Sequence, residues 1–322
     1  MSADIVLMVG SVMLTGWTSY SVELDTAEPS GAWSVEVANP TKEQLALVEV
    51  GTPATLVTEG VSLLRGWLED ARVNQSRSGT TLTLSGRDLC APLVDCVIRP
   101  PRSRPSSLAA AATWLVGEFG LRGAGPIASA EAMTAKAASA AHGDEPAWSW
   151  LRRGAAAAGL DVWSVVGELH VGRLGAVPAV VADLGPSVPG VLSWSWSKSL
   201  AGRRSPLFVV GRGHTRAVVA TVTDPAMATL FRPGTVELDD APAQTGAATF
   251  AAAELRRARV EAEAVEVVVT GHGPTTGRGW RPDTFVRWSG PGAGIWWVEA
   301  VTFSRSNQQG TTTTLRLRAE AR

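Results

Sequence analysis

Apolar and polar residues alternate along much of the first 98 residues, which is the pattern of half-buried β-strands. Val22 and Leu24 alternate with polar neighbours, as do Val35 and Val37, and a Gly- and Pro-containing turn at 28–31 separates the two pairs. Further strands are predicted at 5–14, 54–57, 62–73 and 80–84. The stretch 5–14 follows an acid and is interrupted by Gly and Ser, so we do not expect a signal peptide. The sequence therefore predicts a β domain over residues 1–98.

The chain changes character at 99–105, where three prolines exclude a central strand or helix interior. Ser106 or Ser107 can then cap an Ala-rich helix that runs to about Phe119 and stops at Gly120. Further helices are predicted at 130–141 and 146–158, followed by a hairpin of strands 161–166 and 168–173. We interpret residues 99–185 as a small α/β module.

Strand patterns return from residue 186 to the end of the chain. Leu192, Trp194 and Trp196 alternate with serines, and one helix is predicted at 250–262. The other predicted strands lie at 207–211, 217–223, 265–270, 282–288, 294–304 and 311–318. The predicted fold class is α+β, mainly β, with two similar β-barrel domains, 1–98 and 186–322, flanking the α/β module.

One internal similarity supports the idea of two related barrels. Trp67 and Trp297 are each followed two residues later by an acid, Glu69 or Glu299. Each segment then continues through a polar turn ending in glycine, at 79 or 310, into a Thr-rich strand. Antiparallel hairpins can resemble each other by chance, so the alternative is coincidence. If the similarity is real, both tryptophans begin a strand that pairs with the Thr-rich strand, at equivalent positions.

Composition and charge exclude several classes of protein. Apolar residues make up 45% of the chain and charged residues 18%, which suits a sizeable core. The net charge of −1 disfavours a protein held to nucleic acid by broad basic surfaces. No apolar run approaches the ~20 residues that span a bilayer, so we expect no membrane insertion. Thirteen tryptophans predict aromatic anchors in the core or at interfaces.

Motifs for catalysis or metal binding are mostly missing. There is no GxSxG motif, and the Gly-rich segment 271–279 lacks the Lys-Ser/Thr pair of a phosphate-binding loop. The histidines are not spaced as metal pairs, adjacent acids point in different directions, and two cysteines are interpreted as buried thiols. We therefore expect no catalytic, cofactor-binding or metal-ligating residues and no cofactor. The residues considered are His142, His170, His214, His272, Asp144, Glu145, Asp239, Asp240, Cys90 and Cys96.

Two further features leave alternatives open. Short basic clusters occur at 99–104, 152–153, 203–204 and 256–259, and they suit either a solvated surface or contact with an acidic partner or with passing DNA. Trp-rich β proteins can bind sugars by ring stacking, and glycosidase carboxylates often come from distant positions. The competing function is therefore a carbohydrate-binding or glycoside-cleaving β protein.

A series of motifs resembles the gpP family, the baseplate hub proteins of Mu-like contractile-tail phages, which are related to the hub module of type VI secretion spike proteins. The resemblance covers nearly the whole chain and depends on the order and spacing of the motifs; residues 123–145 and 198–225 fit it least. The matching segments are Gly16-Trp17, Gly66-Trp67, Ser85-Gly86-Arg87-Asp88-Leu89, Leu93-Val94-Asp95-Cys96, the helix at 146–160, Gly279-Trp280-Arg281-Pro282-Asp283, and Gly310 with the strand that follows it.

This resemblance implies a structural protein of a phage or phage-like virion tail, assembled in the host cytoplasm. It implies a homotrimer in which two similar barrels per chain form a pseudo-sixfold ring between the tail tube and the central spike. The implied partners are the chain itself, the spike protein and tail-tube or other baseplate proteins. Phage DNA would pass through the ring without specific binding.

Overall fold

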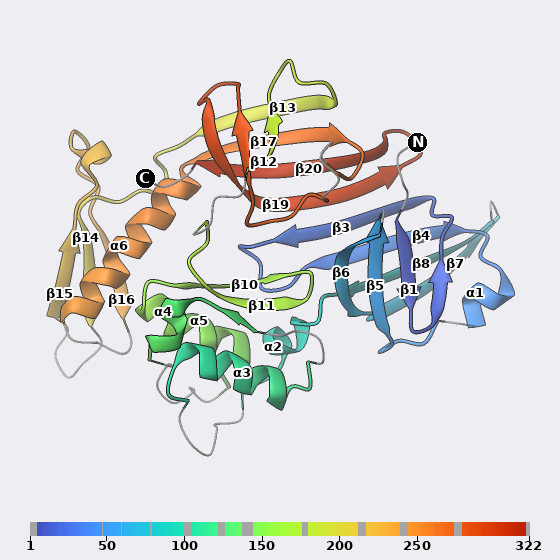
Figure 1. The fold of residues 1–322 in the computed structure, drawn as a ribbon, viewed down its shortest axis with the longest axis horizontal. Coiled ribbons are helices and arrows are strands. Elements are labelled where there is room, and N and C mark those ends of the chain that lie inside the picture. The colour runs from blue at the N-terminus through green and yellow to red at the C-terminus, as the bar shows by residue number, and fades with distance from the viewer. Residues whose placement is uncertain are drawn as a thin grey trace.

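A computed structural model describes residues 5–46, 48–58, 60–77, 79–98, 105–121, 126–136, 144–175, 180–211, 217–238, 244–273 and 279–319. Strands dominate this part of the chain, and the helices lie below the largest sheet and at its two ends (Figure 1). The predicted class, α+β and mainly β, is confirmed.

The largest sheet joins strands from both predicted barrel regions. Its main path contains eight strands, and every neighbouring pair on it is antiparallel. In order these are β13 (Val191–Lys198), β17 (Glu263–Thr270), β20 (Gly310–Ala319), β19 (Gly294–Ser306), β3 (Ser19–Asp25), β4 (Ala32–Ala38), β8 (Gly79–Arg87) and β7 (Asp70–Ser76). β18 (Phe285–Trp288) branches from β19, and β12 (Val180–Leu184) pairs with β18 in parallel.

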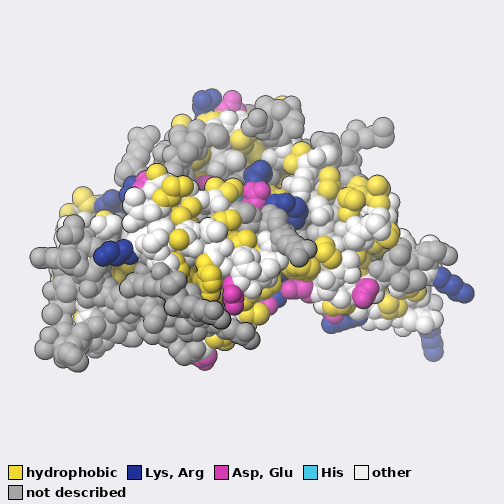
Figure 2. All heavy atoms as spheres, turned by 60° about the horizontal axis from the view of Figure 1, so that its bottom comes forward, with side chains coloured by type: hydrophobic (Ala, Val, Ile, Leu, Met, Phe, Trp, Pro, Cys, Tyr) yellow, Lys and Arg dark blue, Asp and Glu magenta, His cyan; other side chains and the backbone are white. Residues whose placement is uncertain are grey.

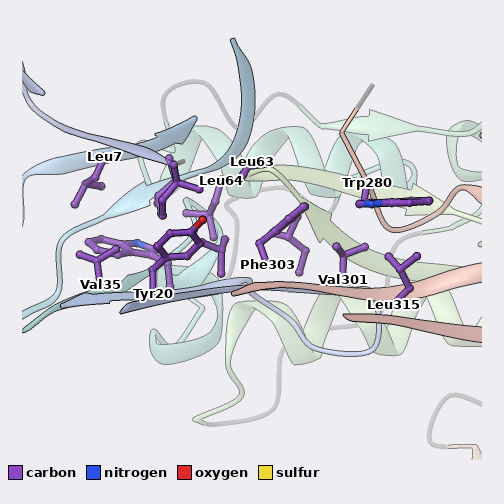
Figure 3. Close-up of a cluster of buried hydrophobic side chains, with 14 of the residues drawn as sticks. Leu7, Tyr20, Val35, Leu63, Leu64, Trp280, Val301, Phe303 and Leu315 are labelled. Atoms are coloured by element: carbon purple, nitrogen blue, oxygen red, sulfur yellow. The ribbon is translucent and has the colours of Figure 1, made fainter. Parts of the chain in front are cut away.

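A four-stranded sheet lies over one face of this long sheet. It consists of β2 (Val12–Leu14), β1 (Val6–Val9), β5 (Pro53–Thr58) and β6 (Val61–Trp67). Side chains of the long sheet, such as Tyr20 and Phe303, point toward Leu7, Leu64 and Trp280 across the core (Figure 3). One apolar cluster therefore extends from the N-terminal strands to β17 and β20.

The middle of the chain has a hydrophobic core of its own. Its helices are α2 (Ala91–Asp95), α3 (Leu108–Glu118), α4 (Ala130–Thr134) and α5 (Ala147–Ala157), and its strands are β9 (Ile127–Ala128), β10 (Asp161–Val165) and β11 (Glu168–Gly172). Ser107 caps α3 by accepting a hydrogen bond from the amide of Ala110, as its position predicts. Leu115, Trp150 and Leu169 are buried together in this core.

A further small unit interrupts the second β region. β15 (Ala217–Val222), β14 (Leu207–Gly211) and β16 (Gly234–Leu238) form a three-stranded sheet beside α6 (Gln244–Glu261). A short turn of helix, η1 (Pro225–Met227), follows the buried Asp224, whose carboxylate accepts hydrogen bonds from Arg203 and Arg259. One further short helix, α1 (Lys42–Ala46), lies between β4 and β5.

Several expectations need correction. No closed barrel is found among the described strands, and strands of the two predicted barrel regions share one sheet in which β19 pairs with β3. The strand expected at 62–73 is divided into β6 and β7, since the chain bends at Leu68 and Glu69. The helix expected at 130–141 ends at Thr134, and residues 137–143 lie outside the described part of the chain. Cys90 is buried as expected, whereas Cys96 is exposed. The domain boundaries at 98/99 and 185/186 stay a prediction.

Candidate assembly interface

The two hairpins singled out in the sequence have the same hydrogen-bonding register. In the first, β7 pairs with β8 from Asp70–Ser85 to Ser76–Gly79, over seven residue pairs. In the second, β19 pairs with β20 from Ala300–Arg316 to Ser306–Gly310, also over seven. Each residue of β7 therefore corresponds to the residue of β19 whose number is higher by 230. Each residue of the return strand β8 corresponds to the residue of β20 whose number is higher by 231. The extra residue lies in the turn.

An irregularity at the same position precedes both hairpins. The β19–β20 register shifts by one residue between Val298 and Ala300, which leaves Glu299 as the extra residue. In the first half, the register shifts by one residue as well, between the Gly66–Asp88 bridge and the Asp70–Ser85 pair. The offset of 230 places Trp67 on Trp297 and Glu69 on Glu299, so the predicted equivalence is confirmed by register. The expectation that both tryptophans begin a strand is wrong, because Trp67 ends β6 and Trp297 lies inside β19.

An ion pair is repeated at these two bends. Arg87 Nε donates to Glu69 Oε2 at 2.8 Å, and Arg318 Nε donates to Glu299 Oε2 at 2.7 Å. Arg87 and Arg318 are related by the return-strand offset of 231. The hydrogen bonds that Arg87 donates to Asp95 and Glu69 raise the pKa of Arg87 above its already high ordinary value. Each acid therefore ties its bend to the return strand of its own hairpin.

The repeat extends to the neighbouring strands. Val35 pairs with Leu84 as Val267 pairs with Leu315, which relates β4 to β17. The next pairs outward, Tyr20–Val35 and Trp194–Val267, relate β3 to β13. On the other side of the bend, the Ala54–Gly66 and Val286–Trp296 pairs relate β5 to β18. The long sheet therefore contains the same order of four strands twice, β13-β17-β20-β19 followed by β3-β4-β8-β7.

Two glycines allow the first bend to form. A Cβ built on Gly66 would lie 1.9 Å from the carbonyl oxygen of Arg87, and one on Gly86 would lie 1.8 Å from that of Trp67. Because both obstacles are backbone atoms, no side chain can move aside to make room. The glycines of the Gly66-Trp67 and Ser85-Gly86-Arg87-Asp88 motifs thus permit the close approach of β6 and β8.

Asp88, the next residue of that motif, joins three parts of the chain. Its buried carboxylate accepts hydrogen bonds from Ser30 in the β3–β4 turn, from the Cys90 amide before α2 and from Ser164 on β10. Burial raises its pKa, and these hydrogen bonds oppose that shift. The first β region and the middle module are therefore connected through one buried polar group.

The ends of the long sheet have unpaired edges within the described part of the chain. β7 pairs with β8 alone and β13 with β17 alone. Their apolar side chains on the core side are only partly covered: Val73 is 52% exposed, and Trp194 and Trp196 are each 40% exposed. Trp194 packs on Trp288, and Trp196 donates a hydrogen bond to Glu263. Exposed apolar residues on an open strand edge are typical of a surface that pairs with another chain.

The face of the long sheet away from the core is lined mainly by small hydroxyl side chains. Ser193, Ser195 and Ser197 of β13 lie on it, and so do residues of the strands that follow. These include Thr314, Thr302, Ser304, Ser21, Ser34, Thr81 and Thr83. Arg316 and Arg318 also lie on this face but are paired with Asp25 and Glu299. Arg72 and Arg87 lie on the same face and pair with Asp70 and Glu69. Since the acids Glu23, Glu36 and Glu266 also lie there, the face offers little free positive charge.

A buried polar contact connects the two halves of the long sheet. His272 Nε2 lies 2.6 Å from the hydroxyl of Tyr20, and its Nδ1 lies 3.0 Å from Oγ1 of Thr313. Since the Thr313 hydroxyl donates to the carbonyl of Gly271, we assign the ring proton to Nδ1, and Nε2 accepts from Tyr20. Burial lowers the pKa of His272 to about 4 and raises that of Tyr20 to about 12. The histidine is thus a neutral structural residue.

The other residues considered for chemistry do not gather into a site among the described residues. His170 stacks on Trp163, and burial lowers its pKa to about 4. Glu145 pairs with Arg153, and the neighbouring Asp144 is exposed. No group of three or more potential metal ligands is found in the described ranges. His142, His214, Asp239 and Asp240 lie outside them.

Charge and hydropathy set further limits on the surface. On the face in Figure 2, basic and acidic side chains of the described residues are interspersed, without a broad basic area. Among the described helices, none combines the length and the apolar character that crossing a membrane requires.

A cavity of about 320 Å³ lies where α5, α6 and the C-terminal strands meet, lined by Trp148, Arg152, Arg256 and Trp297 among others.

Comparison with known sequences identifies the N-terminal region. Residues 4–88 match the family model described as "Mu phage baseplate assembly protein GpP-like, N-terminal". The baseplate hub protein gp44 of Escherichia phage Mu is 29% identical over 96 residues. That match covers 30% of this chain and 25% of the Mu protein. The resemblance to the gpP family is thereby confirmed for the N-terminal region.

Comparison with solved structures supports the fold over almost the whole chain. The 43 kDa tail protein of prophage MuSo2 from Shewanella oneidensis has a TM-score of 0.83 at 23% identity, covering 98% of each chain. A tail protein from Neisseria meningitidis has a TM-score of 0.80 at 21% identity, covering 99% of this chain and 97% of that one. A component of the type VI secretion system of E. coli has a TM-score of 0.60 at 8% identity, covering 97% and 76%.

Proposed function

We propose that this chain is a baseplate hub protein of a Mu-like phage tail, located in the virion and built as a homotrimeric ring. The N-terminal family match and the tail-protein fold support the hub assignment. In this ring, the regions 1–98 and 186–322 are two quasi-equivalent units, and three chains present six such units. The ring joins the tail tube to the central spike.

The repeated strand order is the observation that carries the proposal. Within one chain, β19 of one half pairs with β3 of the other half. By the repeat, β7 is the counterpart of β19 and β13 is the counterpart of β3, and both have free edges. The same kind of contact can therefore form between chains. A head-to-tail contact of this kind produces a closed ring when its rotation allows closure.

Strand direction is consistent with such a contact. Eight strands that alternate in direction place β7 and β13 antiparallel to each other. A second copy can therefore add its β13 to β7 and continue the antiparallel pattern without a break. This strand addition would cover the two free edges of each chain, which are otherwise an aggregation liability.

The polar face of the sheet is suited to a channel. We place this face toward the lumen because the opposite face already packs against the four-stranded sheet and Trp280. Hydroxyl groups and paired arginines would let DNA pass with few lasting phosphate contacts, since affinity for the DNA backbone follows free positive charge. The chain would thus serve a structural rather than a catalytic role, with the spike and tail-tube proteins as further partners.

Electron microscopy of the purified full-length chain, alone and mixed with its spike protein, tests this function. The proposal predicts threefold rings with a central channel in at least one of the two samples. Compact single chains in both samples, or twofold dimers without a channel, would contradict it.

A further inference from the structure

We infer that β7 of one chain pairs with β13 of the next in a defined register, with Val73 opposite Trp196 of the second copy. This inference rests on the proposed ring and adds to it the contacting strands and their alignment. It follows from the contact already present inside the chain, where Phe303 of β19 pairs with Val22 of β3.

The alignment is obtained from two equivalences. The offset of 230 residues between the hairpin strands places Val73 on Phe303. For the second strand, Val22 pairs with Trp33 and Trp33 with Gly86, while Trp196 pairs with Val265 and Val265 with Leu317. Gly86 and Leu317 are related by the return-strand offset of 231.

Trp196 is therefore the counterpart of Val22. Replacing each member of the Phe303–Val22 pair by its counterpart gives Val73 opposite Trp196. The neighbouring pairs on the same face are Gln75 opposite Trp194 and Ala71 opposite Lys198.

Burial at the existing contact shows what the second contact would gain. Phe303 and Val22 are both fully buried, whereas their counterparts Val73 and Trp196 are 52% and 40% exposed in the single chain. Aromatic and β-branched residues directly opposite each other stabilise strand pairs. The register therefore joins two exposed apolar residues on the core side of the extended sheet, where they would continue the core across the boundary between chains.

The polar side of the same register is also compatible. Thr302 and Ser304 of β19 pair with Glu23 and Ser21 of β3. The corresponding residues across the boundary between chains are Arg72 opposite Ser197 and Asn74 opposite Ser195. No like charges face each other in these pairs. A slip by one residue would instead turn Val73 toward a serine on the polar face, because side chains alternate between the faces of a strand.

Cysteine cross-linking tests the register directly. The variant V73C/W196C, in a C96S background because Cys96 is exposed, should form disulfides between chains under mild oxidation. The matched control V73C/S195C represents the slipped register and should cross-link at least about ten-fold less, since its two side chains point to opposite faces. The largest cross-linked species should contain three chains, because a closed ring of three chains has no free edge left.

A second readout separates this inference from the proposed function. The native mass of both variants is measured under reducing conditions, which also shows whether they remain folded and assembled. Trimers in which V73C/S195C cross-links and V73C/W196C does not would overturn the register and leave the proposed hub intact. Trimers in which neither variant cross-links would do the same. Chains that stay monomeric in the reduced variants and in the unmodified protein, each measured with and without the spike protein, would overturn both.

Discussion

Gly66 and Gly86 lie where the backbones of two strands approach too closely for any side chain. Substituting Gly66 with Ala forces a backbone shift, because the new Cβ would lie 1.9 Å from the carbonyl oxygen of Arg87. We expect G66A to lower the free energy of unfolding by about 3 kcal/mol or more. Gly117 in α3 is the matched control, since a Cβ there meets no atom within 4 Å. G117A should be neutral or stabilise by about 0.5–1 kcal/mol. Equal denaturant midpoints for the two variants would contradict this account.

His272 predicts a specific pH dependence of stability. The pKa of this histidine is about 4 in the folded chain and about 6.5 in the unfolded chain. As pH falls below about 6.5, the unfolded state binds a proton that the folded state does not, so stability is lost. Between about pH 7.5 and about pH 5 this one group removes about 2 kcal/mol.

Denaturant unfolding of H272Q at the two pH values measures this contribution. The variant should lose about 2 kcal/mol less than the natural chain over the same interval. H170Q should reduce the loss by a similar amount, because burial lowers the pKa of His170 to about 4 as well. A pH-dependent loss in H272Q as large as in the natural chain would show that His272 is not the neutral buried group described above.

At the level of strands and hairpins, the sequence was informative wherever alternation was regular. The Trp-x-Glu pattern and the Thr-rich return strands correctly indicated two equivalent hairpins. The bend at Leu68 and Glu69 was not predicted, because the close Gly66–Arg87 backbone approach beside it joins segments about twenty residues apart. The β19–β3 contact was also missed, since pairing across nearly 280 residues leaves no local pattern.

The repeated ion pair allows a comparison between the two halves. Glu299 is 5% exposed and pairs with Arg316 and Arg318 beside the β19–β3 contact, whereas Glu69 has a side chain 34% exposed. E299Q removes the acid that pairs with Arg318 and leaves Arg316 with Asp25 alone, so it should destabilise the chain by about 3 kcal/mol. E69Q, at the equivalent solvated position, should cost about 1 kcal/mol or less and depend on salt. Chemical denaturation at two salt concentrations checks both, and equal costs would contradict the proposed difference.

At the scale of the whole molecule, the proposed ring depends on a single chain that contains two copies of one strand order with free edges at its ends. The sequence indicated the two related regions through family resemblance and the hairpin repeat. It could not show that both regions share one sheet and one apolar cluster, because that depends on how distant strands meet. This arrangement leaves β7 and β13 as the surfaces on which assembly depends.

The most direct measurement of assembly is the native mass of the purified full-length chain over a range of concentrations. The account predicts a species of three 33.7 kDa chains, about 101 kDa, formed alone or on addition of the spike protein. V73K, which adds a charge at the centre of the proposed contact between β7 and β13, should shift the equilibrium toward single chains, whereas M13K, at an exposed position on β2, should not. A chain that stays at 33.7 kDa at every concentration, with and without the spike protein, would contradict the central claim.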